Sequence, residues 1–133
     1  MTSRIETGRE ILRSTIGDAY YQRRRDSTNS FNEPLRRLTD EYCFGEVWGD
    51  PALPPKIRSM LVVALLACLG RNNELKTHLG GAINNGCNVE ELRGVLLQVA
   101  IYCGIPAGVE STRIAEEVLR ERGLLDSGAS GTP

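Results

Sequence analysis

The chain contains a single histidine, His78, and Glu74 precedes it by four residues. Residues four apart lie on one face of a helix, so this spacing puts a carboxylate beside an imidazole. Such a carboxylate raises the basicity of the ring and fixes its orientation, which suits a general acid or base near neutral pH. The same spacing is common in ion pairs on solvated helices, and by spacing alone that structural role is the more frequent one.

Four further residues have side chains suited to a site, but spacing alone leaves their roles open. Arg58 opens an apolar segment, where it either lies on the surface or anchors an anionic ligand with its planar guanidinium. Glu46 and Trp48 lie in the segment before it, and a lone tryptophan most often anchors a core or an oligomer interface. Tyr102 ends another apolar segment, where core packing competes with presenting its hydroxyl to a cavity. These patterns indicate a helical domain with one acid/base pair, and they do not specify a reaction.

Helices are the elements expected to position these residues, because apolar residues recur at helical spacing with Gly and Pro between the periodic segments. The expected fold is all-α, with helices over residues 4–16, 32–44, 54–69, 72–85, 89–103 and 107–122. Asn88 with Glu91 three residues later is typical of a helix N-terminus with a capping box. Residues 18–30 are polar, and residues 45–55 are a loop rich in Gly and Pro.

One apolar helix predicts association between copies of the chain. The second half of the helix expected at residues 54–69 is apolar on all sides. Such a helix is buried all round, which a domain of 133 residues rarely achieves alone. We therefore expect residues 1–122 to form one helical domain that assembles into a homo-oligomer. Residues 123–133 are expected to be a flexible tail.

Composition argues against several other classes of protein. Lys and Arg total 16 and Asp and Glu 17, and this near-neutral balance provides no general field for nucleic acid. The longest apolar run, residues 60–69, is too short to span a membrane, and residues 1–17 lack the apolar core of a secretory signal. A cytoplasmic location is expected. The four cysteines form no C-x-x-C pattern of a redox or zinc site, and they are expected to be reduced. Cys68 and Cys103 are expected to act as small hydrophobes.

The chain resembles the γ-carboxymuconolactone decarboxylase family from about residue 5 to residue 122. The matching stretches are Ile16-Gly-Asp-Ala19, Phe44-Gly-Glu-Val-Trp48, Arg58-Ser-Met-Leu61, Glu74-Leu-Lys-Thr-His78, Glu90-Glu-Leu92, Val95-Leu-Leu-Gln98 and Ala100-Ile-Tyr-Cys-Gly-Ile-Pro-Ala107. The resemblance implies an all-α fold shared with alkylhydroperoxidase D and a ring-like homo-oligomer, a trimer or hexamer. It also implies a cofactor-free decarboxylation of a carboxylated butenolide to the β-ketoadipate enol-lactone in aromatic catabolism, with no metal.

The resemblance also implies roles for the candidate residues. His78 is expected to donate a proton, Glu74 to orient its ring, and Arg58 to hold the anionic substrate or the enolate. Glu46 is a weaker candidate for a second acid/base group. The expected substrate contacts are Trp48 and Tyr102.

Two departures from the family pattern affect the expected substrate. The chain has Cys43-Phe44-Gly45-Glu46 where the decarboxylases tend to have Ala-Trp-Gly-Asp, and Asp50 stands where they tend to have an arginine. An anion close to the pocket would disfavour a dianionic substrate by Coulomb repulsion. The peroxide-reducing branch uses C-x-x-C-x-x-x-H, but Arg71 and Glu74 occupy its two thiol positions, so that activity is not expected.

Three interpretations therefore stand beside one another. The first is a decarboxylase of a carboxylated lactone in aromatic degradation. The second is a relative that decarboxylates, isomerises or cyclises a different acid or lactone in secondary metabolism, with Glu74 and His78 kept. The third is a non-catalytic helical assembly module, because a fold does not by itself imply a function.

Overall fold

The computed structural model describes residues 2–126, and every regular element in this part of the chain is a helix. Seven α-helices and one π-helix are present there, and no strand. The all-α class is thereby confirmed, although the helices outnumber the six expected from the sequence. The chain forms two compact units, Met1–Arg58 and Ser59–Pro133, and each is described by itself.

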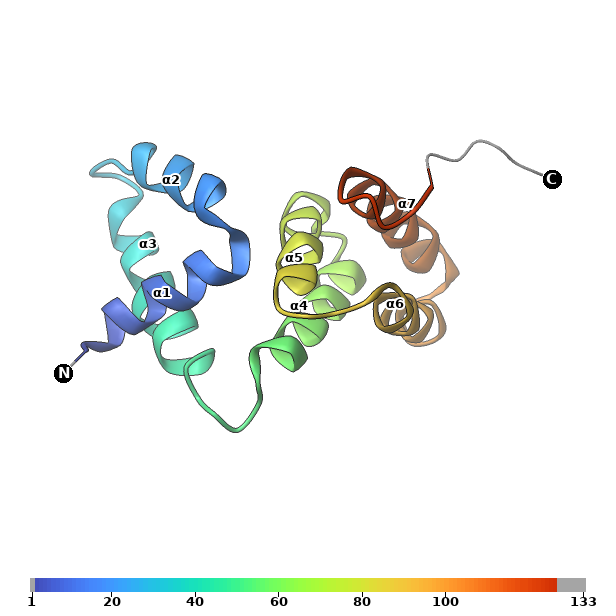
Figure 1. Cartoon of the computed structure of the whole chain (residues 1–133), viewed down its shortest axis with the longest axis horizontal. Coiled ribbons are helices and arrows are strands. Elements are labelled where there is room, and N and C mark those ends of the chain that lie inside the picture. Colours follow the sequence, from blue (N-terminus) through green and yellow to red (C-terminus); the bar gives the residue numbers. More distant parts are fainter. Residues whose placement is uncertain (1, 127–133) are drawn as a thin grey trace. The chain divides into compact units, whose positions relative to one another are not determined.

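The N-terminal unit is built around a close contact between its first helix and a π-helix. Its helices are α1 (Arg4–Ile16), α2 (Asp18–Asp26), α3 (Glu33–Leu38) and the π-helix η1 (Thr39–Val47), followed by the first turn of α4 (Pro55–Leu69). α1 crosses the segment that follows α3 (Figure 1). A Cβ on Gly8 of α1 would lie 1.7 Å from the carbonyl oxygen of Asp40 and 2.7 Å from the amide nitrogen of Gly45. The two backbones can approach this closely because residue 8 has no side chain.

Two segments of this unit differ from the sequence-based expectation. The polar segment 18–30 contains α2 (Asp18–Asp26), which begins with Asp18 and has three consecutive arginines in its last turn. These charges favour a helix because they complement its dipole, and a periodic apolar pattern cannot reveal that effect. The helix expected at residues 32–44 is instead α3 followed by η1, so the loop begins at Trp48 and not at Gly45. The Trp48 amide donates to the Cys43 carbonyl at 2.9 Å, the five-residue step of a π-helix.

The C-terminal unit follows the sequence-based expectation closely. It contains the rest of α4, α5 (Asn72–Asn84), α6 (Val89–Cys103) and α7 (Ile105–Glu121). Only α7 differs by more than one residue at its start, which lies two residues earlier than expected. The predicted capping box is confirmed: Asn88 Oδ1 accepts from the Glu91 amide at 2.8 Å, and Glu91 Oε1 accepts from the Asn88 amide at 2.9 Å. The cap satisfies two amide groups that the start of α6 would otherwise leave open.

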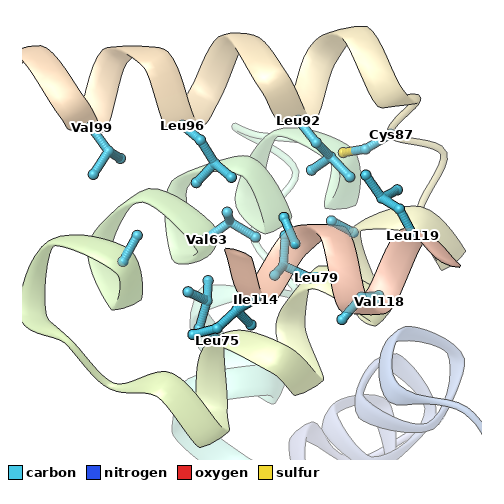
Figure 2. Packing of buried hydrophobic residues seen from close by; sticks show 13 residues of the cluster. Val63, Leu75, Leu79, Cys87, Leu92, Leu96, Val99, Ile114, Val118 and Leu119 are labelled. Atoms are coloured by element: carbon cyan, nitrogen blue, oxygen red, sulfur yellow. The ribbon is translucent and has the colours of Figure 1, made fainter. Parts of the chain in front are cut away.

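An aliphatic cluster forms the core of this unit (Figure 2). Its buried members are Val63, Ala67, Leu75, Leu79, Ala82, Cys87, Leu92, Leu96, Val99, Ile114, Ala115, Val118 and Leu119. Leu92, Leu96 and Val99 extend from one face of α6 toward the helices that carry the other members (Figure 2). Leu125 also packs against this cluster, although it belongs to the segment expected to be a tail. Residues 127–133 of that expected tail lie outside the described residues.

Within the described residues of one chain α4 is buried along one face only, so the burial of its other sides by association with further copies stays a prediction. Its buried face consists of Ser59, Val63 and Ala67, whereas Leu61, Leu65 and Leu69 are exposed. The three leucines follow one another at four-residue steps, so they lie along one exposed apolar stripe. None of the helices within residues 2–126 has both the length and the apolar character that a membrane crossing requires.

The expectation of four reduced cysteines is also wrong. A disulfide joins Cys68, near the end of α4, to Cys103, the last residue of α6, with their Cα atoms 5.6 Å apart. That separation lies within the range a disulfide requires, but the sequence hides it because 35 positions separate the two residues. Both cysteines are exposed, so neither is a core hydrophobe. Neither Cys43 nor Cys87 takes part in a disulfide, and partial desolvation raises the pKa of the Cys43 thiol.

Candidate active site

The first turns of α5 carry the predicted acid/base pair. Leu75 and Leu79 point into the core of the C-terminal unit and fix the rotation of the helix about its axis. Glu74 and His78 each precede one of these leucines by one position, so they share a neighbouring face of α5. Glu74 is exposed and His78 is half-buried. The ring therefore lies at the boundary between core and solvent, where a small change of environment alters its protonation.

Two opposing effects act on the pKa of His78, and burial is the larger of them. Burial disfavours the charged imidazolium and lowers the pKa below its ordinary value of 6.5, while the negative charge of Glu74 acts to raise it. The sequence correctly anticipated the contribution of Glu74, but it could not indicate the larger cost of removing the ring from water. His78 is therefore neutral at neutral pH when no ligand is bound.

Arg58 is held in the first turn of α4 and retains an open hydrogen-bond donor. Its backbone amide donates to the carbonyl of Pro54 at 3.1 Å, and its Nη2 donates to the carbonyl of Asp50 at 3.1 Å. Its Nε is buried and has no hydrogen-bond partner among the described residues. A fixed guanidinium with a free, buried N–H group is suited to bind an oxyanion.

The carboxylate of Asp50 is occupied within its own turn. Its Oδ1 accepts a hydrogen bond from the Ala52 amide at 2.9 Å, while its backbone carbonyl faces Arg58. This residue therefore positions the guanidinium through its backbone, and its charge is partly compensated by an amide dipole.

Glu46 and Trp48 lie at the end of η1 and already have partners within the N-terminal unit. Glu46 is exposed, and its carboxylate forms an ion pair with Arg4. The Trp48 ring is buried and stacks on Phe44, with 5.1 Å between the ring centroids. These contacts match the anchoring role that the sequence favoured for the tryptophan.

Tyr102 does not pack in the core, contrary to the more frequent of its two expected roles. It is the penultimate residue of α6, next to the cystine at Cys103, and is 80 % exposed. A side chain this exposed contributes little to the packing of its own unit.

The candidate residues thus fall into two groups. Glu74 and His78 come together on α5 in the C-terminal unit, whereas Arg58, Glu46 and Trp48 belong to the N-terminal unit. Sequence reasoning missed a third group, in which the buried Asp40 pairs with Arg9 and Arg24. The three consecutive arginines at residues 23–25 were the only signal for it.

The all-α fold, with Glu74 and His78 together on α5, defines a small helical protein that carries a carboxylate beside an imidazole. Residues 33–117 match the model of the carboxymuconolactone decarboxylase family, and the chain belongs to this family. It is similar to a 4-carboxymuconolactone decarboxylase of Acinetobacter baylyi, with 34 % identity over 121 residues that cover 91 % of this chain and 90 % of the relative. A nitrosuccinic acid decarboxylase (npaB) of Metarhizium robertsii is 30 % identical over 97 % of this chain and 89 % of that protein. Peroxisomal protein 2 of Schizosaccharomyces pombe is 30 % identical over 76 % of this chain and half of its own length.

Proposed function

We propose that this chain is a cofactor-free carboxy-lyase that converts 4-carboxymuconolactone to the β-ketoadipate enol-lactone in aromatic catabolism. The observation that carries the proposal is the similarity to the Acinetobacter decarboxylase along nine-tenths of both chains. The neutral ring of His78 beside Glu74 provides the acid/base group that such a reaction needs.

The substrate itself explains why the reaction needs no cofactor. Its departing carboxylate lies on a carbon conjugated through one C=C bond to the lactone carbonyl. When CO₂ leaves, the bonding electron pair spreads over a dienolate and onto the carbonyl oxygen. The protein has to bind the anion, stabilise the developing enolate and deliver one proton to the carbon alpha to the carbonyl.

In this proposal His78 delivers that proton. The ring is neutral in the free protein because burial disfavours its charged form. An anionic substrate next to the ring offsets this cost, as Glu74 does in part, so substrate binding promotes protonation of the ring from solvent. The imidazolium then gives its proton to the dienolate after CO₂ has left.

Arg58 is the proposed contact for the substrate carboxylate or the enolate oxygen, because its buried Nε–H group is open. Glu46 is the weaker candidate for a second acid/base group, since Arg4 already holds its carboxylate. Trp48 is a proposed wall of the substrate site, and the exposed Tyr102 is the weakest of the proposed substrate contacts.

The test is to incubate the purified protein with 4-carboxymuconolactone and measure CO₂ release as a function of pH. A protonated donor predicts that kcat/KM falls as pH rises through the lowered pKa of His78, below 6.5. The variant Glu74→Gln removes the charge that raises this pKa, so the pH limb moves to still lower pH. The variant His78→Gln loses at least about tenfold in kcat/KM, or about 1.4 kcal/mol of transition-state stabilisation.

Lys76→Gln is the matched control, because Lys76 lies on the same helix but pairs with Glu117 and Glu121 at 3.8 and 3.5 Å. It should leave the pH profile unchanged. An inactive wild-type protein would reject this substrate, and a His78→Gln variant that keeps more than a tenth of the activity would reject the assigned proton donor.

A second candidate function is decarboxylation of a different acid. The similarity to the Metarhizium nitrosuccinic acid decarboxylase supports it, since that alignment covers 97 % of this chain. The two candidates share the loss of CO₂ and differ in the acid. Measuring kcat/KM for both acids with the same preparation separates them, and the better substrate should show the same dependence on His78.

We also propose that the chain assembles as a homo-oligomer, a trimer or hexamer, through the exposed stripe of α4. Leu61, Leu65 and Leu69 form this stripe, and Leu65 is 61 % exposed. Light scattering should give three or six times the chain mass of 14.6 kDa for the wild type. Leu65→Lys should lower that mass, whereas Leu35→Lys, at an exposed leucine of the N-terminal unit, should not. A wild-type mass of one chain would overturn the assembly.

A further inference from the structure

We propose that the N-terminal unit binds a small oxyanion with two or more negative charges in an arginine-lined hollow, a site separate from the one assigned to decarboxylation. The hollow is lined by residues of α2, α3 and the adjoining parts of α1 and η1, and its volume is about 370 Å³. Its basic lining consists of Arg9, Arg24, Arg25, Arg36 and Arg37. A hollow of this size accommodates a small metabolite.

The charges around the hollow do not cancel. Five arginines and only two carboxylates, Asp40 and Glu33, line it, which leaves a formal charge of +3. Asp40 is 4 % exposed and is shared by two guanidiniums, with Arg9 Nε at 3.1 Å and Arg24 Nη2 at 2.8 Å. One buried carboxylate therefore fixes two arginines in place without neutralising both of them.

A third arginine is fixed without any carboxylate. Arg36 Nη1 donates to the hydroxyls of Ser27 at 3.1 Å and Thr28 at 2.9 Å, and also to the carbonyl of Arg24. These bonds tie α3 to the end of α2 through neutral acceptors, so the positive charge is held rigidly and remains uncompensated. A ligand that meets prepositioned guanidiniums loses less of its binding energy to ordering the side chains.

Two further arginines on the rim lack an anionic partner in the described part of the chain. Arg25 and Arg37 form no ion pair with a carboxylate there. Arg13, one turn before α2, shows the contrast, because Asp18 pairs with it. An adjoining hollow of about 250 Å³ shares Arg24 and Arg36 with the first and adds Arg23. The two carboxylates offset only part of the repulsion among these charges, and a bound anion would offset more of it.

The kind of ligand follows from the donors and from the charge of the whole chain. Guanidiniums bind carboxylate and phosphate oxygens in pairs, so both a phosphate ester and a dicarboxylate fit the site. The net charge of the chain is −1, which provides no extended field for a nucleic acid. The excess of positive charge at the hollow is local, and this favours a small anion.

Calorimetric titration of the full chain at low ionic strength, where screening is weak, tests the proposal. The probes are inorganic phosphate, pyrophosphate and succinate, with sodium chloride as the ionic control. We expect saturable binding of at least one probe with a dissociation constant below about 1 mM. Binding limited to the phosphates identifies a phosphorylated ligand, and binding limited to succinate identifies a dicarboxylate.

The double variant Arg25→Gln/Arg37→Gln should weaken this binding at least tenfold. A control variant, Arg93→Gln/Arg120→Gln, removes the same charge from exposed positions of the C-terminal unit and should change the binding less than twofold. Absence of saturable binding for all three probes, or equal weakening in both double variants, would overturn the site.

The decarboxylation assay separates this inference from the proposed function. Arg25→Gln/Arg37→Gln should retain the wild-type kcat/KM, since neither arginine has a role in that reaction. A loss of activity in parallel with a loss of anion binding would mean that the hollow and the active site are one, and would overturn a separate site. Absence of decarboxylation in the wild type would leave the titration result unaffected.

Discussion

The two units of this chain stabilise their interiors by different means. The C-terminal unit buries thirteen hydrophobic residues in one cluster. The N-terminal unit buries fewer apolar side chains, among them Phe44 and Trp48, and adds a buried charged residue, Asp40, between two arginines and a contact between two helix backbones at Gly8. Apolar burial is non-directional and tolerates small shifts, whereas a buried ion pair needs its partners in fixed positions. The two units also carry different chemical groups. The titrating ring of His78 belongs to the C-terminal unit, and the arginine-lined hollow belongs to the N-terminal unit.

The largest expected effect is a loss of apolar packing in the C-terminal unit. Leu75 is fully buried, so Leu75→Ala removes its contacts and leaves a cavity. It should lower the free energy of unfolding by about 2–5 kcal/mol, as measured by urea denaturation. Leu35→Ala, at an exposed leucine of the N-terminal unit, is the control and should have little effect. Equal losses in the two variants would contradict the assignment of the core.

The disulfide gives the next largest effect. Cys68 and Cys103 are 35 positions apart, so their bond restricts the unfolded chain substantially. Cys103→Ser should lower the stability of the oxidised protein by about 3 kcal/mol. Under reducing conditions, where the wild type has also lost the bond, the variant and the wild type should be about equally stable. Cys43→Ser changes an exposed free thiol and should leave stability unchanged under both conditions. A Cys103→Ser variant as stable as the oxidised wild type would contradict a structural role for the bond.

The buried carboxylate is the corresponding test of the N-terminal unit. Asp40→Asn keeps the shape of the side chain but leaves Arg24, which is largely buried, without its countercharge. We expect a loss of roughly 1–3 kcal/mol in urea denaturation, because a desolvated guanidinium then lacks its partner. Asp18→Asn breaks an exposed ion pair with Arg13 and serves as the control, with no measurable loss expected. A neutral result for Asp40→Asn would mean that this interior does not depend on its charges.

The same difference explains which parts of the structure the sequence could predict. α1, α4 and α6 have apolar residues at helical spacing and clear end signals, and their bounds follow from the sequence. α2 was missed because it has charged residues instead of an apolar stripe. The helix expected at residues 32–44 covers most of η1, but the π-helical spacing and the end at Val47 were not predicted. Periodicity reports burial of apolar side chains and carries no signal for a helix held by charge or by close backbone contact.

The candidate site likewise combines features that the sequence revealed with features that depend on the fold. The four-residue step from Glu74 to His78 is a local property and was visible in the sequence. The net direction of the His78 pKa shift depends on burial by residues distant along the chain, and the sequence contained no measure of it. The partner of Glu46, which is Arg4, lies 42 positions away and was equally hidden.

The smallest expected effects come from the two capping boxes, one in each unit. The hydrogen bonds at Asn88 are 2.8 and 2.9 Å long, whereas those at Ser3 are 3.2 and 3.4 Å. Asn88→Ala should therefore lower the free energy of unfolding by about 1 kcal/mol, and Ser3→Ala by somewhat less.

Hydrogen exchange is the sharper measurement, because each compact unit has its own cooperative contacts. Asn88→Ala should speed exchange mainly in α6, and Ser3→Ala mainly in α1. Faster exchange throughout the chain in both variants would mean that the units open together, and the contrast between their interiors would then not extend to their unfolding.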